Sequence, residues 1–269
     1  TSRDEVGHLA AAFNQMSSEL AEVDRMRRDL VANVSHELRT PISALQAVLE
    51  NLVDGVEQPK PETLETMLRQ VERLGRLVSQ LLDLSRLESG AVPLQTKPFA
   101  VRDLLADAAR EADFQSQQRA DKSLDVTIHV EPDRLSIHAD PERLHQVIAN
   151  LLDNAVRHSP ASGRVSLAAA ERGDEVRIEV TDEGPGISEA ESDRVFERFH
   201  QTAGGRAIGN RGVGLGLSIC RHIVDAHGGR VVLPVDEGDH RHSELLGLLR
   251  VALPAVAPDD LCPPARREN

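Results

Sequence analysis

The sequence predicts a helical hairpin that closes into a dimeric four-helix bundle, followed by an α/β domain. Residues from about 17 to 88 follow an almost uninterrupted helical periodicity, broken once at Asp54-Gly55 and at the Pro59-Lys60-Pro61 stretch. Glycine and proline there end one helix and begin another. Beyond Gly90, short alternating apolar runs and glycine-rich turns replace the helical pattern, which indicates a mixed α/β domain.

Apolar residues of the second helix recur every seven positions, as in a coiled coil or a bundle. Two such series run in parallel: Leu64, Val71 and Val78, and Met67, Leu74 and Leu81. Further leucines widen this stripe beyond what one partner helix covers, so we expect a homodimer. The alternative is a hairpin within one chain that packs on the second domain.

The elements of the second domain follow from local signals. Asp140-Pro141-Glu142 places an acidic cap and a proline at the start of a helix that runs to about Arg157. Apolar residues alternate on both sides of Gly173-Asp174, which predicts a β-hairpin. The other expected elements are helices at 99–119 and 214–226, strands at 124–130, 135–139, 230–233 and 248–253, and a loose tail from residue 254.

Composition excludes several function classes. Of the 269 residues, 31 are Lys or Arg and 44 are Asp or Glu, giving a formal net charge of −13. With no Trp, no Tyr and only 5 Phe, we expect no nucleic-acid partner, because both a basic surface and base-stacking side chains are lacking. No apolar run approaches the roughly 18 residues that span a bilayer. Cys220 and Cys262 have no metal-like or redox-like spacing, so we expect a soluble segment in a reducing compartment.

A polar stripe in the first helix carries one candidate reaction centre. Asn33, His36, Thr40 and Ser43 lie at three- and four-residue spacing beside a buried seam of Leu38, Leu45 and Leu52. An exposed imidazole is largely neutral at neutral pH and can act as a nucleophile. The adjacent Glu37 can accept a hydrogen bond from the ring, and the hydroxyl of Thr40 lies one turn further on.

Pro41 follows this stripe directly. Proline removes its own N–H and clashes with the carbonyl four residues before it, that of Glu37, so we expect the helix to bend beside His36.

Four patches in the second domain suit a nucleotide. Asn150 and Asn154 share a helix face, where amide oxygens can meet Mg²⁺. Asp182 ends a strand before Gly184 and Gly186, where a carboxylate can accept the exocyclic amine of adenine. Phe196 and Phe199 come next, and each taken alone is more typical of the core than of a ligand contact. The glycine cluster at 212–216 opens a helix whose N–H groups can cradle phosphates, and no Lys-Ser/Thr follows it as in a P-loop.

In this order the patches resemble those of a sensor histidine kinase of a bacterial two-component system. His36 to Pro41 matches the H box of that family, 150–158 the N box, and 182–186 the first glycine box. Phe196 and Phe199 match the F box, and 212–217 matches the second glycine box. The resemblance implies a HAMP linker end at 1–20, a HisKA-type dimerisation and phosphotransfer hairpin at 21–90, a GHKL-type ATP-binding domain of the Bergerat α/β sandwich fold at 91–254, and a tail at 255–269.

The resemblance also implies the chemistry. His36 attacks the γ-phosphate of Mg-ATP with Glu37 as base, Asn154 holds Mg²⁺, and the phosphoryl group passes to an aspartate of a response regulator receiver domain. Glu37 and Thr40 also occupy the positions used for phosphatase activity towards that partner. The implied nucleotide-binding residues are Asn150, Asn154, Arg157, His158, Asp182, Gly184, Gly186, Ile187, Phe196, Arg198, Phe199, Gly212, Val213, Gly214, Leu215, Gly216 and Leu217. Arg206, in the loop expected to close as a lid, is a further candidate for phosphate contact.

Residues 4–16 resemble the end of a HAMP linker, which in this family follows a membrane helix. We therefore expect the cytoplasmic portion of a protein anchored in the inner membrane upstream of residue 1. Two other interpretations remain: a dimeric docking or phosphatase module with a regulatory nucleotide site, and an unrelated ATPase of the same nucleotide fold. The second leaves the histidine-bearing helix unexplained.

Overall fold

The computed structural model describes residues 2–56, 58–88, 93–118, 125–160, 163–192, 194–201, 214–233 and 247–254. The chain divides into two units, residues 1–79 and 80–269, and each is described by itself. The domain boundary predicted at residues 90/91 stays a prediction.

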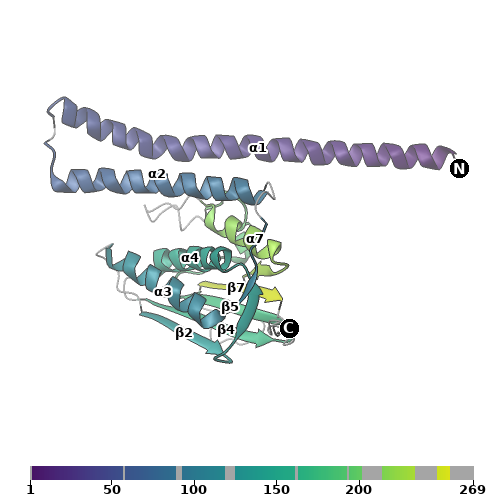
Figure 1. Ribbon diagram of the computed structural model, residues 1–269. Helices are drawn as coiled ribbons and strands as arrows, with labels where there is room; N and C mark the ends of the chain where they lie inside the picture. The colour runs from purple at the N-terminus through teal and green to yellow at the C-terminus, as the bar shows by residue number, and fades with distance from the viewer. Residues whose placement is uncertain are drawn as a thin grey trace, which may run out of the picture. The chain divides into compact units, whose positions relative to one another are not determined.

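The first unit contains most of the predicted helical hairpin, whose second helix extends beyond residue 79 (Figure 1). Helix α1 (Ser2–Val53) ends in a turn at Gly55, whose φ is +70°, and helix α2 (Pro61–Glu88) follows. Helix α1 is longer than predicted, since it begins at Ser2. It continues as a helix through Pro41, which is buried.

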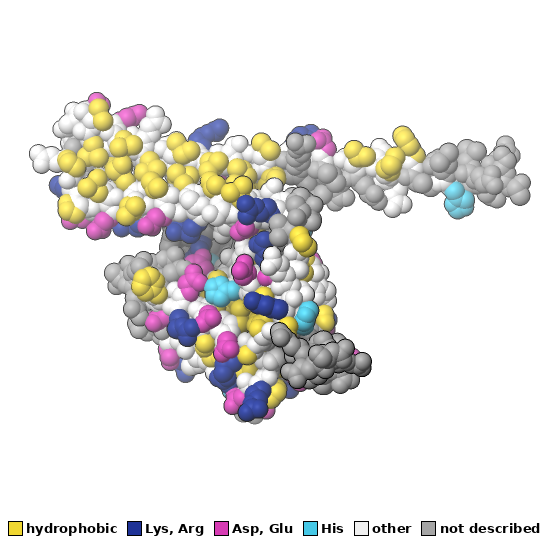
Figure 2. Space-filling model, viewed as in Figure 1, with side chains coloured by type: hydrophobic (Ala, Val, Ile, Leu, Met, Phe, Trp, Pro, Cys, Tyr) yellow, Lys and Arg dark blue, Asp and Glu magenta, His cyan; other side chains and the backbone are white. Residues whose placement is uncertain are grey.

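The two heptad series of α2 differ in exposure. Met67 and Leu74 are half-buried, as are Leu38, Leu45 and Leu52 of α1, so these side chains form the seam within the hairpin. The other series stays open to solvent, at 50% for Leu64, 55% for Val71 and 46% for Val78. Figure 2 shows hydrophobic side chains gathered in a row along the hairpin, and we call the exposed set of Ile42, Leu49, Leu64, Leu68, Val71 and Val78 the open apolar face.

The second unit contains a five-stranded mixed sheet in the order β2-β4-β5-β7-β6. Strands β2 and β4 are parallel and the other neighbours are antiparallel. Helices cover one face of this sheet (Figure 1). The strands are β2 (Asp125–Glu131), β4 (Arg164–Arg172), β5 (Glu175–Asp182), β6 (Arg230–Val232) and β7 (Gly247–Pro254), and the helices are α3 (Val101–Gln118), α4 (Pro141–His158) and α7 (Gly216–Ala226), with a short α5 (Glu189–Ser192).

The expected α/β architecture is confirmed, with corrections to the starts of two helices. The helix expected from Phe99 begins at Val101, because β1 (Lys97–Ala100) pairs antiparallel with β3 (Ser136–Ala139). Phe99 lies opposite Ile137, a pairing between distant residues that no local pattern reveals. The strands expected at 124–130 and 230–233 are β2 and β6. The helix expected from Gly214 begins two residues later, at Gly216.

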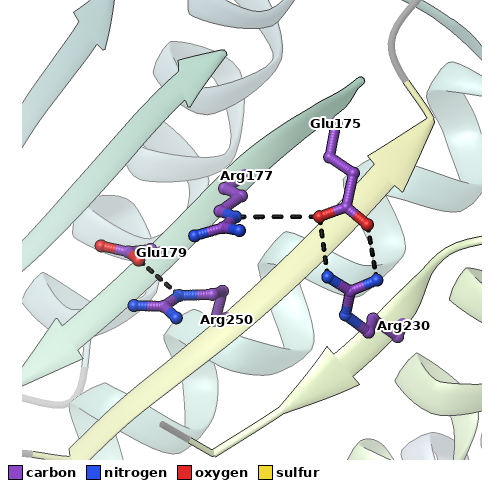
Figure 3. A network of polar contacts seen from close by, with 5 residues as sticks. All are labelled: Glu175, Arg177, Glu179, Arg230 and Arg250. Atoms are coloured by element: carbon purple, nitrogen blue, oxygen red, sulfur yellow. Dashed lines mark hydrogen bonds and ion pairs between the residues drawn. The ribbon is translucent and has the colours of Figure 1, made fainter. Parts of the chain in front are cut away.

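The two faces of the sheet have different chemistry. Along β5, Val176, Ile178 and Val180 are buried in alternation with half-exposed charged residues. Figure 3 shows the charged set on the opposite face: Arg230 of β6 contacts Glu175 through two nitrogens at 2.5 and 2.8 Å, and Arg250 of β7 contacts Glu179 at 2.6 Å. These ion pairs join three neighbouring strands, while the apolar face packs on the helices.

Candidate functional site

Helix α4 carries the asparagine pair and begins as predicted. The carboxylate of Asp140 caps it by accepting from the backbone N–H groups of Glu142 (3.1 Å) and Arg143 (3.2 Å), with Pro141 in the first turn. The leucines, valines and isoleucine of its inner stripe are buried, so Asn150 and Asn154 lie at the border of that stripe and are half-buried. The helix therefore presents two amides, one turn apart, from a fixed position on the sheet.

The buried amide nitrogen of Asn150, Nδ2, has no oxygen or nitrogen acceptor among the described residues. Its neighbour is the thiol of Cys220 on α7. Burial raises the pKa of this thiol to about 12, and a hydrogen bond from the Asn150 amide acts in the opposite direction. A thiol sulfur is a weak acceptor. A buried donor left in this state is destabilising by about 1–3 kcal/mol, and a ligand oxygen would relieve that cost.

Asp182 is the last residue of β5 and continues its buried alternation, so its side chain points to the helix-covered face. It is 8% exposed. Burial raises the pKa of this carboxyl to about 6, although the backbone N–H of Gly184, which donates to Oδ1 at 2.7 Å, acts in the opposite direction. The site thus holds a poorly solvated carboxylate that gains from an external hydrogen-bond donor.

Gly184 lies between Asp182 and the end of α4. A Cβ at this position would lie 2.5 Å from Oδ1 of Asp182 and 3.0 Å from the carbonyl oxygen of His158. Only glycine fits there without displacing one of them. This close approach brings the first glycine patch against the end of the asparagine helix.

Phe199 and Gly214 join the phenylalanine patch to the second glycine cluster. Phe199 donates its backbone N–H to the carbonyl of Gly214 at 2.8 Å and has a left-handed backbone with φ +60°. Such a conformation is strained for an aromatic residue. Gly214 has φ +75°, and a Cβ on it would lie 2.7 Å from backbone atoms of Phe199 and His200.

Helix α7 begins directly after this contact. Its N-cap is Leu215, which makes no side-chain capping hydrogen bond, so no N-cap side chain among the described residues satisfies the first backbone N–H groups of the helix. Such an N-terminus favours an anion. A Cβ on Gly216 would lie 3.9 Å from Cγ of Asn150, so this N-terminus adjoins the unpartnered amide.

The three close approaches connect all four patches that the sequence predicted: Gly184 with His158, Gly216 with Asn150, and Gly214 with Phe199. Arg157 is paired with Asp153 one turn before it. The other described candidates keep their predicted positions: Asn154, Arg198 and Leu217 are half-buried, as are Gly186 and Ile187, while Leu215 and Phe196 are buried. Gly212, Val213 and Arg206 lie outside the described residues.

Phe196 has a partner that the sequence did not reveal. The guanidinium of Arg221 on α7 lies 5.3 Å from the centre of its ring, so Phe196 packs as part of the core and holds a cation over its face.

The hairpin carries the other predicted centre. His36 and Thr40 are exposed, as expected, and the hydroxyl of Thr40 donates to the carbonyl of His36 at 3.3 Å. Glu37 pairs with Arg73 of α2, with 3.5 Å between Oε2 and Nη2 and both side chains at most one-quarter exposed. Sequence reasoning missed Arg73. The one sequence feature that could have indicated this ion pair is the position of Arg73 next to the half-buried Leu74 of α2.

The geometry thus defines a class of protein: an α/β unit with four patches that suit a nucleotide, joined in one chain to a hairpin with an exposed histidine. Residues 26–90 match the family described as His Kinase A (phospho-acceptor) domain. Residues 139–247 match the family described as Histidine kinase-, DNA gyrase B-, and HSP90-like ATPase.

Known proteins agree with both matches. The chain is 39% identical over 232 residues, 86% of its length, to signal transduction histidine-protein kinase BaeS of Escherichia coli, of which it covers 49%. Its fold resembles the histidine kinase AdeS of Acinetobacter baumannii, with a TM-score of 0.66 and 26% identity over 82% of this chain and 98% of that one. A structure of full-length ShkA in complex with AMPPNP gives a TM-score of 0.59 at 26% identity, over 85% of this chain and 46% of that one.

The chain belongs to the sensor histidine kinase family, and its second unit is an ATP-binding domain. It spans about half the length of BaeS.

Proposed function

We propose that this chain is the ATP-dependent autokinase part of a sensor histidine kinase, with His36 as the phosphorylated residue. The observation that carries this proposal is the exposed imidazole of His36 on helix α1, within the segment that matches a phospho-acceptor domain. An exposed side chain can present a ring nitrogen to a nucleotide. The neighbouring Glu37 supplies a carboxylate.

In this reaction a ring nitrogen of His36 forms a bond to the γ-phosphorus of ATP, while the bond from that phosphorus to the β,γ-bridging oxygen breaks and ADP leaves. The other ring nitrogen gives up its proton, which Glu37 accepts. Because phosphoryl transfer depends mainly on positioning and charge neutralisation, the protein contributes few covalent steps.

The residues of the second unit suit the nucleotide. Asp182 would accept from the exocyclic amine of adenine, and the donor Nδ2 of Asn150 would contact phosphate oxygens, since Mg²⁺ takes oxygen ligands. The amide oxygen of Asn154 would supply one ligand of Mg²⁺. When bound, this ion neutralises charge on the phosphates. The AMPPNP complex of ShkA supports the assignment of a nucleotide to this fold.

Incubation with γ-labelled ATP and Mg²⁺ tests the proposal. The protein is expected to acquire an acid-labile, alkali-stable label that His36→Gln abolishes. His8→Gln is the matched control, because His8 is also exposed on α1. Label retained in His36→Gln would remove His36 from this role.

Mixed dimers extend the test. His36→Gln lacks the acceptor and Asn154→Ala lacks the metal ligand, so label on the second chain in a mixture shows transfer between chains of a homodimer. No label in the mixture, with both homodimers inactive, shows transfer within one chain.

We further propose that the phosphoryl group passes to an aspartate of a response regulator receiver domain, and that Thr40 assists its later removal. The hydroxyl of Thr40 lies one turn from His36 and is exposed, where it can orient a water molecule towards a docked acyl phosphate. Thr40→Ala is expected to keep autophosphorylation and lose dephosphorylation of a phosphorylated receiver domain. Equal loss of both activities would contradict the separate role.

We also propose that the full-length protein is membrane-anchored and that this part lies in the cytoplasm. Support comes from residues 4–16, which resemble a HAMP linker. Among the described residues, no helix is both long and apolar enough to cross a bilayer. Fractionation of the full-length protein tests this, and recovery in the soluble fraction would contradict it.

A further inference from the structure

His227, at the end of α7, makes two hydrogen bonds that determine its chemical state. Its Nδ1 lies 2.7 Å from the carbonyl oxygen of Ile223, and its Nε2 lies 3.0 Å from the backbone nitrogen of Asp140. A carbonyl only accepts and a backbone N–H only donates, so Nδ1 carries the proton and Nε2 is the acceptor. The ring is therefore neutral, with a single tautomer, in this arrangement.

Hydrogen bonds also hold the backbone at His227 in place. Its own N–H donates to the carbonyls of Ile223 (3.2 Å) and Val224 (3.0 Å), and the following Gly228, with φ +71°, ends the helix. A Cβ on Gly229 would lie 2.3 Å from the carbonyl oxygen of Ala252 in β7. The ring is thus held from both sides, and Nε2 points at Asp140 without free rotation.

Asp140 is the other half of this contact, and it is 7% exposed. Its Oδ1 caps α4 and its Oδ2 accepts the backbone N–H of Gln95 at 2.9 Å. One buried residue therefore ties together the segment before β1, the start of α4 and, through its own N–H, the end of α7. We call the Asp140–His227 hydrogen bond the helix clasp.

The helix clasp lies at the opposite ends of α4 and α7 from the nucleotide residues. The two helices touch in antiparallel register: Asp140 with His227, the carbonyl of Val147 with the thiol of Cys220 at 3.6 Å, and Asn150 with Gly216. Asn150 carries the unpartnered amide and Gly216 begins the phosphate-binding N-terminus. Because helices are stiff, a shift at the clasp moves one of these groups relative to the other.

We propose that His227 is a positioning residue for nucleotide binding, which acts by fixing α7 against α4 through the helix clasp. The inference rests on the proposed nucleotide site. Loss of the Nε2 acceptor leaves the N–H of Asp140 buried and unpaired, so the two helices find a new register in which Asn150 and the start of α7 no longer meet the same phosphates.

Calorimetric titration with ADP and Mg²⁺ tests the proposal, with two substitutions that separate positioning from packing. His227→Leu removes both hydrogen bonds and is expected to weaken nucleotide affinity about tenfold. His227→Gln retains a donor and an acceptor on one side chain and is expected to stay within about twofold of the natural protein. His222→Leu is the control, because His222 is also half-buried on α7, and no change is expected.

Unfolding temperatures of the same variants identify a purely structural role. If His227→Leu unfolds earlier but binds ADP with unchanged affinity well below its unfolding temperature, the proposal is wrong. If the natural protein binds no nucleotide, the proposed function fails instead. Should His227→Leu fail to fold, His227→Asn takes its place, because its shorter side chain is expected not to reach the N–H of Asp140, and the same two outcomes support or overturn the proposal.

Discussion

Asp182→Asn is expected to stabilise the protein while it weakens nucleotide binding. Burial raises the pKa of Asp182 from 3.8 to about 6. Because the pKa is higher in the folded state, folding takes up a proton between about pH 4 and 6, and the contribution of this group to stability falls as pH rises through that range. Above pH 6 the folded protein retains an ionised, buried carboxylate.

The size of the effect follows from the shift. About two pH units at about 1.4 kcal/mol each correspond to about 3 kcal/mol at pH 8. At pH 5 the same linkage gives about half of that value. An asparagine keeps an oxygen for the 2.7 Å hydrogen bond from Gly184 and carries no charge. For a unit of this size, 3 kcal/mol raises the unfolding temperature by roughly 6–12 °C.

Binding is expected to change in the opposite direction. A hydrogen bond from the adenine amine to a carboxylate contributes about 1.5–3 kcal/mol, so affinity for ADP falls roughly 10- to 100-fold. Scanning calorimetry at pH 5 and 8 measures stability, since the chain has no Trp or Tyr for fluorescence. Titration calorimetry measures affinity.

Glu183→Gln is the matched control for this substitution. Glu183 is the next residue, but its side chain is 38% exposed and pairs with Arg164 at 3.4 Å. Such a pair contributes about 1 kcal/mol or less, and the pH dependence of stability is expected to stay unchanged. An Asp182→Asn protein that is less stable than the natural one at pH 8, or that binds ADP equally well, would refute the reasoning.

Gly214→Ala is expected to weaken nucleotide binding at least about tenfold. Gly173→Ala is the control, because Gly173 also has a positive φ (+62°) but nothing lies within 4 Å of the added Cβ, and binding is expected to stay unchanged. Equal titration curves for the two variants would contradict the role of the close approach at Gly214. Arg73→Ala leaves Glu37 without its ion-pair partner and is expected to slow autophosphorylation about three- to tenfold at unchanged ADP affinity, so an unchanged labelling rate would count against orientation of Glu37 by Arg73. Val71→Glu places a charge on the open apolar face. A dimer interface on this face would bury an unpaired carboxylate, which is destabilising by several kcal/mol, so light scattering is expected to show a monomer. A dimer at the same concentration would exclude Val71 from the interface.

Local signals were sufficient for most elements of the second unit. The acidic cap and proline at Asp140-Pro141 fixed the start of α4, and Gly173-Asp174 fixed the β4–β5 hairpin, because each signal acts within a few residues. The helix predicted from Phe99 was wrong at its start, since pairing of β1 with β3 involves residues that are distant in the sequence. Heptad spacing also predicted the two apolar series of α2. Only the solvent exposure of their side chains in the structure showed which series packs within the hairpin and which stays open.

For the candidate site too, the sequence showed some features and only the structure showed the others. The residue types and their order were visible in the sequence, because a nucleotide requires amides, a carboxylate and glycines at positions set by helix and strand periods. What brings them together was not visible: Phe199 reaches Gly214, Glu37 reaches Arg73, and Asp140 reaches His227. The last pair is separated by 87 positions.

The sequence by itself determined the family, the order of the elements and the groups that do the chemistry, because helical and strand periods, caps and short motifs are written in neighbouring residues. Only the tertiary structure decided which donor stays unpartnered, which carboxyl loses its solvent and has its pKa raised, and which histidine is held neutral. These properties depend on burial and on partners from remote segments, and both exist only once the chain has packed.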